Sequence, residues 1–384
     1  MLLSCLPLAH WFRPAISLLQ VEVRQRTYLP IKHSMFNRLR KHFLSTPARS
    51  SVSVSTGELE FYGSKRQNKV TLRNLLDTGS GKTLGRGSPI LENCSLAENI
   101  NIQVASFLHR ELPIRLAHRA LALESIDIFR KSIHVSEVAS WYKKSFQQLI
   151  DCPAPKDTKT EQLFAKTIGD IYERHSGTLL MMAKGAYEIK QMLGYDTITF
   201  AEQDILQHKF DDFYSSRIGI RMMIGQYLSL RDENNTDPNM IGLISLKCSP
   251  YDIAQEAIHD ATYVCTRTHG EAPKVEIKGP DLHFPYVPTH IKYIFVELLK
   301  NSMRATIEKH GTDNPPPIKI IISDGESNED IVFKISDEGG GIKRSNMRRI
   351  WSYLFTTADP RVLDSMYVIL ICFRLNYQLL YFSG

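Results

Sequence analysis

Apolar residues recur at helical spacing through the middle of the chain, from Gln103 to about Leu230. They stand three and four positions apart, as in Leu108, Leu112 and Leu116, with few Gly or Pro residues among them. Short breaks interrupt this pattern near 133–136, 152–155, 194–196 and 234–238. Four long segments joined by short breaks predict an antiparallel four-helix bundle, which we assign to residues 103–245.

A different pattern begins near Pro250. It predicts helices at 253–266 and 288–310, the second with Pro288 at its start and Gly311 just beyond its end. It also predicts strands at 274–277, 318–322 and 331–335, the last two joined by the polar turn 323–330. This order predicts an α/β sandwich with its helices on one face, over residues 246–361, and an α+β fold class for the whole chain.

The first 57 residues are basic, with eight Lys or Arg residues and one acid, Glu22. From Met35 onward, basic and apolar residues alternate as in a basic amphipathic helix. We interpret residues 1–57 as a mitochondrial targeting presequence with its linker, read from Met1 or from Met35, rather than as an ordinary basic tail. The rest of the chain is nearly neutral, so its charge predicts no nucleic-acid partner.

Residues 58–102 are predicted to form a flexible linker. They contain a Gly/Ser-rich stretch at 77–88 that includes Gly-Ser-Gly-Lys-Thr. A phosphate-binding loop needs four residues between its first Gly and the Gly-Lys pair, and an apolar strand before it; neither is present here. The sequence has no run of eighteen apolar residues, so no membrane span is predicted. Its six cysteines form no CxxC pair, which predicts a reducing compartment and no metal cluster.

One polar stripe on the helix predicted at 288–310 carries candidate chemistry. Glu297, Asn301 and Arg304 stand at i, i+4 and i+7, so they share a face. An amide oxygen suits Mg²⁺, a carboxylate one turn away can act as a base, and a guanidinium binds phosphate oxygens. Lys300 adds a second cation nearby. Taken alone, the stripe is also what the solvated face of an ordinary surface helix looks like.

A glycine run follows the strand predicted at 331–335. Asp337 stands at its end, followed by Glu338 and three glycines, Gly339 to Gly341. Three glycines cost conformational entropy, which a turn alone rarely justifies. They let a flat ligand approach the backbone, while the carboxylate accepts a hydrogen bond from an amino group such as that of adenine. Together, the helix and this loop predict a nucleotide site.

These motifs resemble a known family. Glu297-Leu-Leu-Lys-Asn301 with Asp337-Glu-Gly-Gly-Gly341 resembles the N and G1 boxes of the GHKL, or Bergerat-fold, ATPases. The stretches 111–119, 216–222, 286–306, 336–342 and 355–358 are similar to the mitochondrial pyruvate dehydrogenase kinases and branched-chain 2-oxoacid dehydrogenase kinases. The resemblance implies a four-helix bundle followed by a Bergerat domain. It also implies an enzyme of the mitochondrial matrix that uses ATP and Mg²⁺ to phosphorylate, and so inactivate, an E1α subunit.

The resemblance assigns roles residue by residue. It implies that Glu297 is the catalytic base and Asn301 the Mg²⁺ ligand, and that Asp337 reads adenine. The other residues that it implies for ATP binding are Lys300, Arg304, Gly339, Gly341, Thr356 and Thr357. Expected partners are E1α and the lipoyl-bearing E2 core, with a homodimer for a full-length form.

The choice of substrate complex stays open. Tyr293 looks like the branched-chain branch, whereas Phe213-Tyr214 and Arg174-His175 look like the pyruvate branch, which we take as the first candidate. His109, His118 and His175 are the candidates for a phospho-accepting histidine on the bundle, but we expect each to be a packing or surface residue instead.

The family pattern stops after Arg361. Residues 362–384 are aromatic and Leu-rich and lack the second glycine box, so we expect an aberrant or alternative tail and an incomplete ATP-binding domain. Two functional hypotheses follow. The chain is a truncated record of an active serine kinase, or it is a catalytically dead interaction module that binds the dehydrogenase complex.

Overall fold

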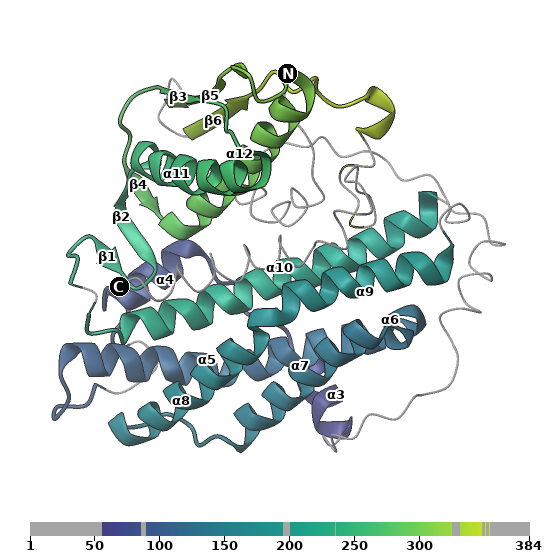
Figure 1. Ribbon diagram of the computed structural model, residues 1–384. Helices are drawn as coiled ribbons and strands as arrows, with labels where there is room; N and C mark the ends of the chain where they lie inside the picture. Colours follow the sequence, from purple (N-terminus) through teal and green to yellow (C-terminus); the bar gives the residue numbers. More distant parts are fainter. Residues whose placement is uncertain are drawn as a thin grey trace. The chain divides into compact units, whose positions relative to one another are not determined.

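The computed structural model divides the chain into two compact units (Figure 1). It describes residues 56–85, 90–194, 200–234, 236–324, 331–347, 350 and 353. One unit ends at Glu233 and the other resumes at Asn234, so the boundary lies before the predicted position at 245/246. The difference arises because the residues just after Asn234 lead into two short strands that belong to the second unit.

The first unit is helical, and its long helices match the predicted four segments. They are α5 (Leu96–Glu124), α7 (Ile133–Asp151), α8 (Thr158–Arg174) with α9 (Thr178–Leu193), and α10 (Phe200–Leu230), with a short α6 (Asp127–Lys131) between α5 and α7. The 3-10 turn η2 (His175–Gly177) divides the third segment, because Ser176 and Gly177 favour the helix less than their neighbours do. Figure 1 shows α9 continuing beyond α8 instead of folding back on it.

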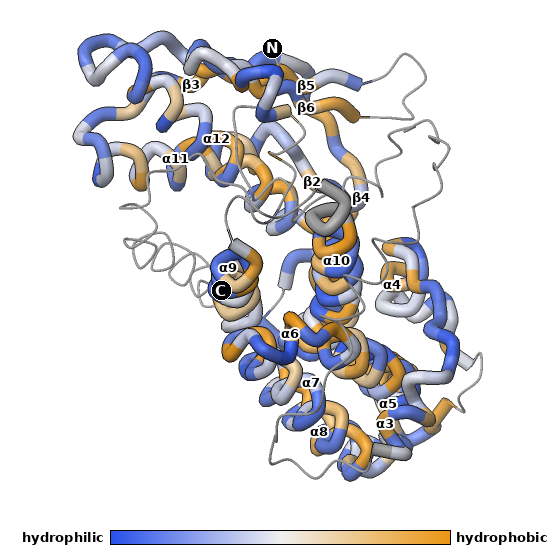
Figure 2. Tube along the Cα trace, turned by 90° about the vertical axis from the view of Figure 1, so that its right-hand side faces the viewer, coloured by the Kyte–Doolittle hydropathy of each residue, from blue (hydrophilic) through white to orange (hydrophobic). Residues whose placement is uncertain are grey.

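The core of this unit is built by the apolar stripes that define the helices. Leu108, Leu112 and Leu116 of α5 are almost fully buried, as are Phe146 of α7 and Ile168 of α8. A capping box starts α5: Ser95 Oγ accepts the Glu98 backbone N–H at 3.2 Å, and Glu98 Oε2 accepts that of Ser95 at 2.8 Å. Figure 2 shows polar and apolar residues alternating along the helices, as amphipathic packing requires.

The prediction of a flexible linker over residues 58–102 is wrong. This stretch forms α3 (Thr56–Ser64) and α4 (Leu72–Gly79), and it also includes the start of α5. Glu111 of α5 holds it in place by accepting the Asn68 backbone N–H at 2.9 Å and the Asn68 side-chain amide at 2.8 Å. Arg115 pairs with the same Glu111 at 2.8 Å. Leu59 of α3 is buried and Tyr62 packs edge-on against Phe146 of α7, so polar and apolar contacts together fix the segment. Its two helices have nine and eight residues, too short for periodicity to reveal them.

The second unit holds two three-stranded sheets. In the first, β2 (Ile244–Cys248) pairs antiparallel with β1 (Met240–Ile241) and β4 (Phe284–Tyr286). All three strands were missed from sequence, and β1 and β4 have only two and three residues. In the second, β5 (Ile318–Asp324) pairs parallel with β3 (Val275–Lys278) and antiparallel with β6 (Ile331–Ser336). The strands of this second sheet confirm the predicted order.

Two helices, α11 (Pro250–His269) and α12 (Pro288–His310), cover one face of the β3–β5–β6 sheet (Figure 1). Side chains alternate along β5, so that Ile318, Ile320 and Ile322 point into the core while Lys319 and Ile321 face outward. The predicted layer order is thereby confirmed. In the part of the chain that the structure describes, no helix is long and apolar enough to cross a membrane.

Candidate active site

Helix α12 positions the candidate chemistry, and its own sequence sets where it begins and ends. Pro288 occupies its first turn, and Gly311 ends it with a φ of 78°, a value that L residues rarely adopt. Leu299 and Met303 are fully buried against the sheet. Burying that apolar stripe turns the polar stripe of the same helix to a neighbouring face.

The polar stripe is buried, contrary to what a solvated surface helix would show. Glu297 is 6% exposed and Asn301 is 7% exposed. Glu297 Oε1 accepts a hydrogen bond from Lys300 Nζ at 2.7 Å. Its Oε2 is buried and has no hydrogen-bond partner among the described residues. A buried carboxylate oxygen left unsatisfied costs free energy, so this atom is the strongest structural sign of a missing ligand.

Arg304 completes the stripe one turn further along. Its Nε lies 3.5 Å from Glu308 Oε1, close enough for an ion pair. The same Nε has no hydrogen-bond partner among the described residues, so the contact with Glu308 is not a hydrogen bond. The side chain is 27% exposed. A weakly held guanidinium beside Asn301 is placed to bind phosphate oxygens through its fork.

The loop after β6 carries the candidate base-reading group. Asp337 Oδ1 accepts the Gly339 backbone N–H at 2.9 Å, and Asp337 Oδ2 accepts the Ser302 hydroxyl of α12 at 3.0 Å. Both oxygens of the carboxylate are therefore held, one by its own loop and the other by the helix.

Close packing explains the glycines of this loop. A Cβ added at Gly339 would lie 2.5 Å from Ala305 Cβ and 2.9 Å from the Ala305 carbonyl carbon, so only glycine lets the loop lie on α12. Gly340 and Gly341 have φ values of 95° and 71°, in the left-handed region. The predicted roles of Gly339 and Gly341 in shaping the loop agree with this geometry.

Two further contacts hold the loop, and sequence reasoning missed them. Lys309 Nζ and His310 Nε2, both on the last turn of α12, lie 2.9 Å and 3.0 Å from the Glu338 carbonyl oxygen. Ser302 was missed as well, although its place directly after Asn301 was a usable signal. The Lys309 and His310 contacts had no sequence signal, because they meet a backbone atom.

The structure thus brings together most of the residues predicted for the site. Glu297, Lys300, Asn301 and Arg304 lie on α12, and the loop with Asp337, Gly339 and Gly341 packs against the same helix. Thr356 and Thr357 lie outside the described residues, as do the predicted presequence residues 1–55 and the tail 362–384.

The residues present fit a Mg²⁺-bound nucleotide. The Asn301 amide oxygen is the kind of ligand that Mg²⁺ prefers, and Glu297 stands one turn before it with an Oε2 that has no hydrogen-bond partner among the described residues. Lys300 and Arg304 supply positive charge on the same helix. Asn301 is therefore the residue that would hold the ion, and Asp337 is the group that would face the base.

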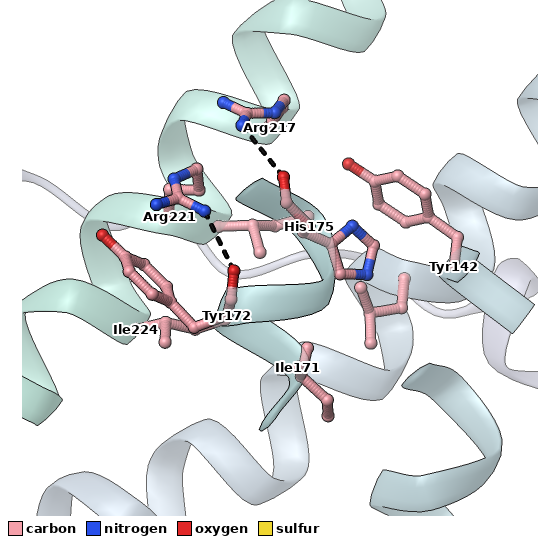
Figure 3. Close-up of a pocket in the computed structure, with 9 residues that line it drawn as sticks. Tyr142, Ile171, Tyr172, His175, Arg217, Arg221 and Ile224 are labelled. Atoms are coloured by element: carbon pink, nitrogen blue, oxygen red, sulfur yellow. Dashed lines mark hydrogen bonds between the residues drawn. The ribbon is translucent and has the colours of Figure 1, made fainter. Parts of the chain in front are cut away.

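A small cavity inside the helical unit has a mainly apolar and aromatic lining, to which two arginines contribute (Figure 3). Arg217 of α10 donates to the His175 carbonyl at 3.2 Å, and Arg221 donates to the Tyr172 carbonyl at 3.2 Å while its guanidinium lies 3.8 Å from the Tyr172 ring centre. Tyr142 packs edge-on against His175, with ring centres 4.5 Å apart. The cavity measures about 10 Å³, room for a single water molecule.

The candidate phospho-accepting histidines are held by structural contacts. His175 Nε2 lies 2.9 Å from Ser145 Oγ, and burial, then the charge of Arg217, lowers its pKa to about 3. His109 Nε2 lies 2.8 Å from the Cys152 carbonyl oxygen, and His118 Nε2 lies 2.8 Å from that of Lys65. All three therefore behave as packing histidines.

Comparison with known proteins identifies the relatives of this chain. Residues 69–245 match the family described as mitochondrial branched-chain alpha-ketoacid dehydrogenase kinase. A mitochondrial pyruvate dehydrogenase (acetyl-transferring) kinase of Arabidopsis thaliana is 38% identical over 77% of this chain and 76% of its own length. The corresponding kinase of Drosophila melanogaster is 33% identical over 81% of this chain and 74% of its own length. That of Schizosaccharomyces pombe is 40% identical over 56% of this chain and 50% of its own length.

These similarities identify first a class of protein and then a family within it. The relatives are protein kinases, and their likeness extends over both units. The chain belongs to the family of mitochondrial pyruvate dehydrogenase kinases and branched-chain α-ketoacid dehydrogenase kinases.

Proposed function

We propose that this chain is an ATP-dependent serine kinase that phosphorylates the E1α subunit of the mitochondrial pyruvate dehydrogenase complex and thereby inactivates it. The observation that carries the proposal is the buried polar stripe of α12, with an unpartnered Glu297 oxygen, beside a loop that presents Asp337. The names of the relatives support pyruvate dehydrogenase as the target.

Each residue of the site has its own role in phosphoryl transfer. Asp337 accepts a hydrogen bond from the adenine amino group, and Lys300 and Arg304 offset the phosphate charge. Asn301 would hold a Mg²⁺ ion, which would neutralise charge on the phosphates. Glu297 takes the proton of the substrate serine hydroxyl through its unpartnered Oε2. Thr356 and Thr357 are proposed as further nucleotide contacts.

We place the protein in the mitochondrial matrix, directed there by residues 1–57, with E1α and the lipoyl-bearing E2 core as partners and with a homodimer as the form of a full-length protein. A fluorescent fusion of residues 1–60 tests the targeting. Import into the matrix supports it, and a fusion that stays in the cytosol refutes it.

A second candidate is a branched-chain 2-oxoacid dehydrogenase kinase, favoured by the family match over residues 69–245 and by Tyr293. Purified E1 of each complex, offered separately with radiolabelled ATP, tests the two. Faster serine phosphorylation of pyruvate dehydrogenase E1 supports the first proposal, and the reverse order favours the second. A chain that binds neither ATP nor transfers phosphate, yet still binds the complex, is the interaction module.

A further inference from the structure

The loop that carries Asp337 is attached to α12 at three places, and sequence motifs account for none of the side chains that make these attachments. Ser302 binds the Asp337 carboxylate, and Lys309 and His310 meet on the Glu338 carbonyl oxygen. Between them, Gly339 packs directly on Ala305. All of these contacts lie on consecutive turns of one helix.

We propose that Ser302, Lys309 and His310 are positioning residues that set the selectivity of the site for adenine. They do so by holding Asp337 and its loop in one orientation on α12. This inference rests on the proposed function, because it takes Asp337 as the group that reads the base.

Ser302 fixes the plane of the carboxylate. The side chain is 4% exposed, and its hydroxyl donates to Oδ2 at 3.0 Å while the Gly339 amide donates to Oδ1 at 2.9 Å. Two donors on opposite oxygens prevent rotation of the carboxylate about its own axis. A carboxylate has about four acceptor positions, so these two bonds orient Asp337 without exhausting its capacity to accept a bond from a ligand.

Lys309 and His310 fix the backbone that follows. Cations on the last turn of a helix already interact favourably with its terminal carbonyls, so their charge alone has an ordinary explanation. The helix terminus does not explain their positions, because both exposed side chains contact one carbonyl oxygen of a different segment, that of Glu338. That convergence holds Glu338, the residue between Asp337 and Gly339.

The consequence is a fixed spacing between the two ends of the nucleotide site. Asn301 and Glu297, at the proposed phosphate end, stand on the same rigid helix that anchors the proposed base-reading loop. A site organised before its ligand arrives loses less entropy on binding. The anchors should therefore raise both the affinity for ATP and the preference for ATP over GTP, which carries an oxygen where adenine carries its amino group.

The first test replaces the buried anchor. Ser302→Ala in the full chain should weaken ATP binding about tenfold, since it removes a hydrogen bond to a charged group, and should narrow the preference for ATP over GTP. Ser302→Thr, which keeps a hydroxyl, should retain more of that preference. Ser323→Ala, at an exposed position of β5, is the matched control and should leave both values unchanged.

The second test uses the exposed anchors, whose replacement should leave the fold intact. Lys309→Ala with His310→Ala should lower the ATP preference by about threefold, in line with the loss of exposed hydrogen bonds. Lys334→Ala, at an exposed position of β6, is the control. Hydrogen exchange of the Gly339 amide, measured without nucleotide, should be faster in both anchor variants than in their controls.

The outcomes separate this inference from the proposed function. If the wild-type chain does not prefer ATP to GTP, the assignment of Asp337 as the base reader fails, and the inference fails with it. If Asp337→Ala abolishes the preference while both anchor variants keep it, the proposed function stands and the inference is wrong. Loss of the preference in both anchor variants, with melting temperatures near those of the controls, supports the inference.

Discussion

The two units bury polar groups in different ways. In the helical unit the buried charged residues are spread over several helices, and each joins one element to another: Glu111 with Arg115 and Asn68, Glu161 with Tyr227 and Arg231, Arg217 with the His175 carbonyl. In the α/β unit the buried polar residues concentrate on α12, where Glu297, Asn301, Ser302 and Thr306 lie within three turns.

The difference shows which buried groups make α12 the candidate site. Burial of a charge alone does not, because Glu161 is 3% exposed and accepts hydrogen bonds from Tyr227 at 2.5 Å and from Arg231 at 2.7 Å. Glu297 is buried to a similar extent but keeps one oxygen without a partner among the described residues. Asp127 of the helical unit also has a buried carboxylate oxygen without a hydrogen-bond partner, but that oxygen lies in an ion pair with Lys131 at 2.7 Å. What distinguishes α12 is the combination of such an oxygen with a buried amide, Asn301, and a glycine loop packed on the same helix.

The comparison predicts the largest effect at Asn301. Asn301→Ala removes the proposed metal ligand and leaves no oxygen in its place, so phosphoryl transfer should be abolished in a radiolabel assay. The unfolding transition of the helical unit, followed by circular dichroism, should not move. Metal-dependent phosphorylation that survives the substitution would refute the role given to Asn301.

A smaller effect is expected at Glu297, on turnover and not on ATP binding. Glu297→Gln keeps the shape of the side chain and an acceptor for Lys300, but it removes the base. Turnover should fall by about 10²–10⁴-fold, the usual contribution of a positioned base, while ATP affinity changes little. Parallel loss of affinity and turnover, measured by calorimetry and by a steady-state assay, would assign Glu297 to nucleotide binding instead.

In the helical unit, replacing a buried charged residue should lower stability and leave ATP affinity unchanged. Glu111→Ala leaves Arg115 buried without its carboxylate partner, and breaking such a pair costs about 3–5 kcal/mol in the free energy of unfolding. Urea unfolding measures that loss, and Glu111→Gln, which retains acceptor capacity for Asn68, should lose less. ATP affinity of the folded protein should be the same in both variants; a drop would mean that the polar contacts of the bundle reach the site.

At neutral pH the cavity of Figure 3 gives the smallest effect, because this effect appears only as the pH is lowered. Burial lowers the pKa of His175 to about 3, whereas a histidine in the unfolded chain has a pKa of about 6.5. Between about pH 6.5 and pH 3, His175 therefore carries a proton in the unfolded chain but not in the folded one. Stability is then full above about pH 6.5 and falls as the pH is lowered, by about 1.4 kcal/mol per pH unit for this group. His175→Gln should flatten that slope in urea unfolding at several pH values. An unchanged slope would contradict the buried, neutral state of His175.

Much of this arrangement was predictable from sequence, and the exceptions have physical causes. The periodicity of Leu108, Leu112 and Leu116 predicted the bundle, and the punctuation by Pro288 and Gly311 gave the bounds of α12 correctly. The motifs singled out α12 and the glycine loop, two segments that the structure packs against each other. Periodicity missed α3 and α4, because each helix is short and contacts with α5 and α7, such as that of Asn68 with Glu111, hold the segment in place.

The anchors of the glycine loop were missed for a related reason. The position of Ser302 directly after Asn301 was a signal, but it does not show that the hydroxyl binds Asp337. Lys309 and His310 bind a backbone carbonyl that no sequence motif displays. Motifs report which groups chemistry requires. Contacts that orient those groups depend on how close two segments approach, which only the folded chain reveals.

The central claim is that α12 and the loop at Asp337 form an adenine-reading site, and one titration tests it most directly. ATP and GTP are titrated against the wild-type chain and Asp337→Ala, each paired with a thermal melt without nucleotide. The account predicts that the wild type prefers ATP and that the variant loses this preference. It also predicts a loss of about 1.5–3 kcal/mol of ATP binding free energy, beyond any change in melting temperature. A lower melting temperature with unchanged ATP affinity of the folded fraction would show that Asp337 only stabilises its turn, and would contradict the account.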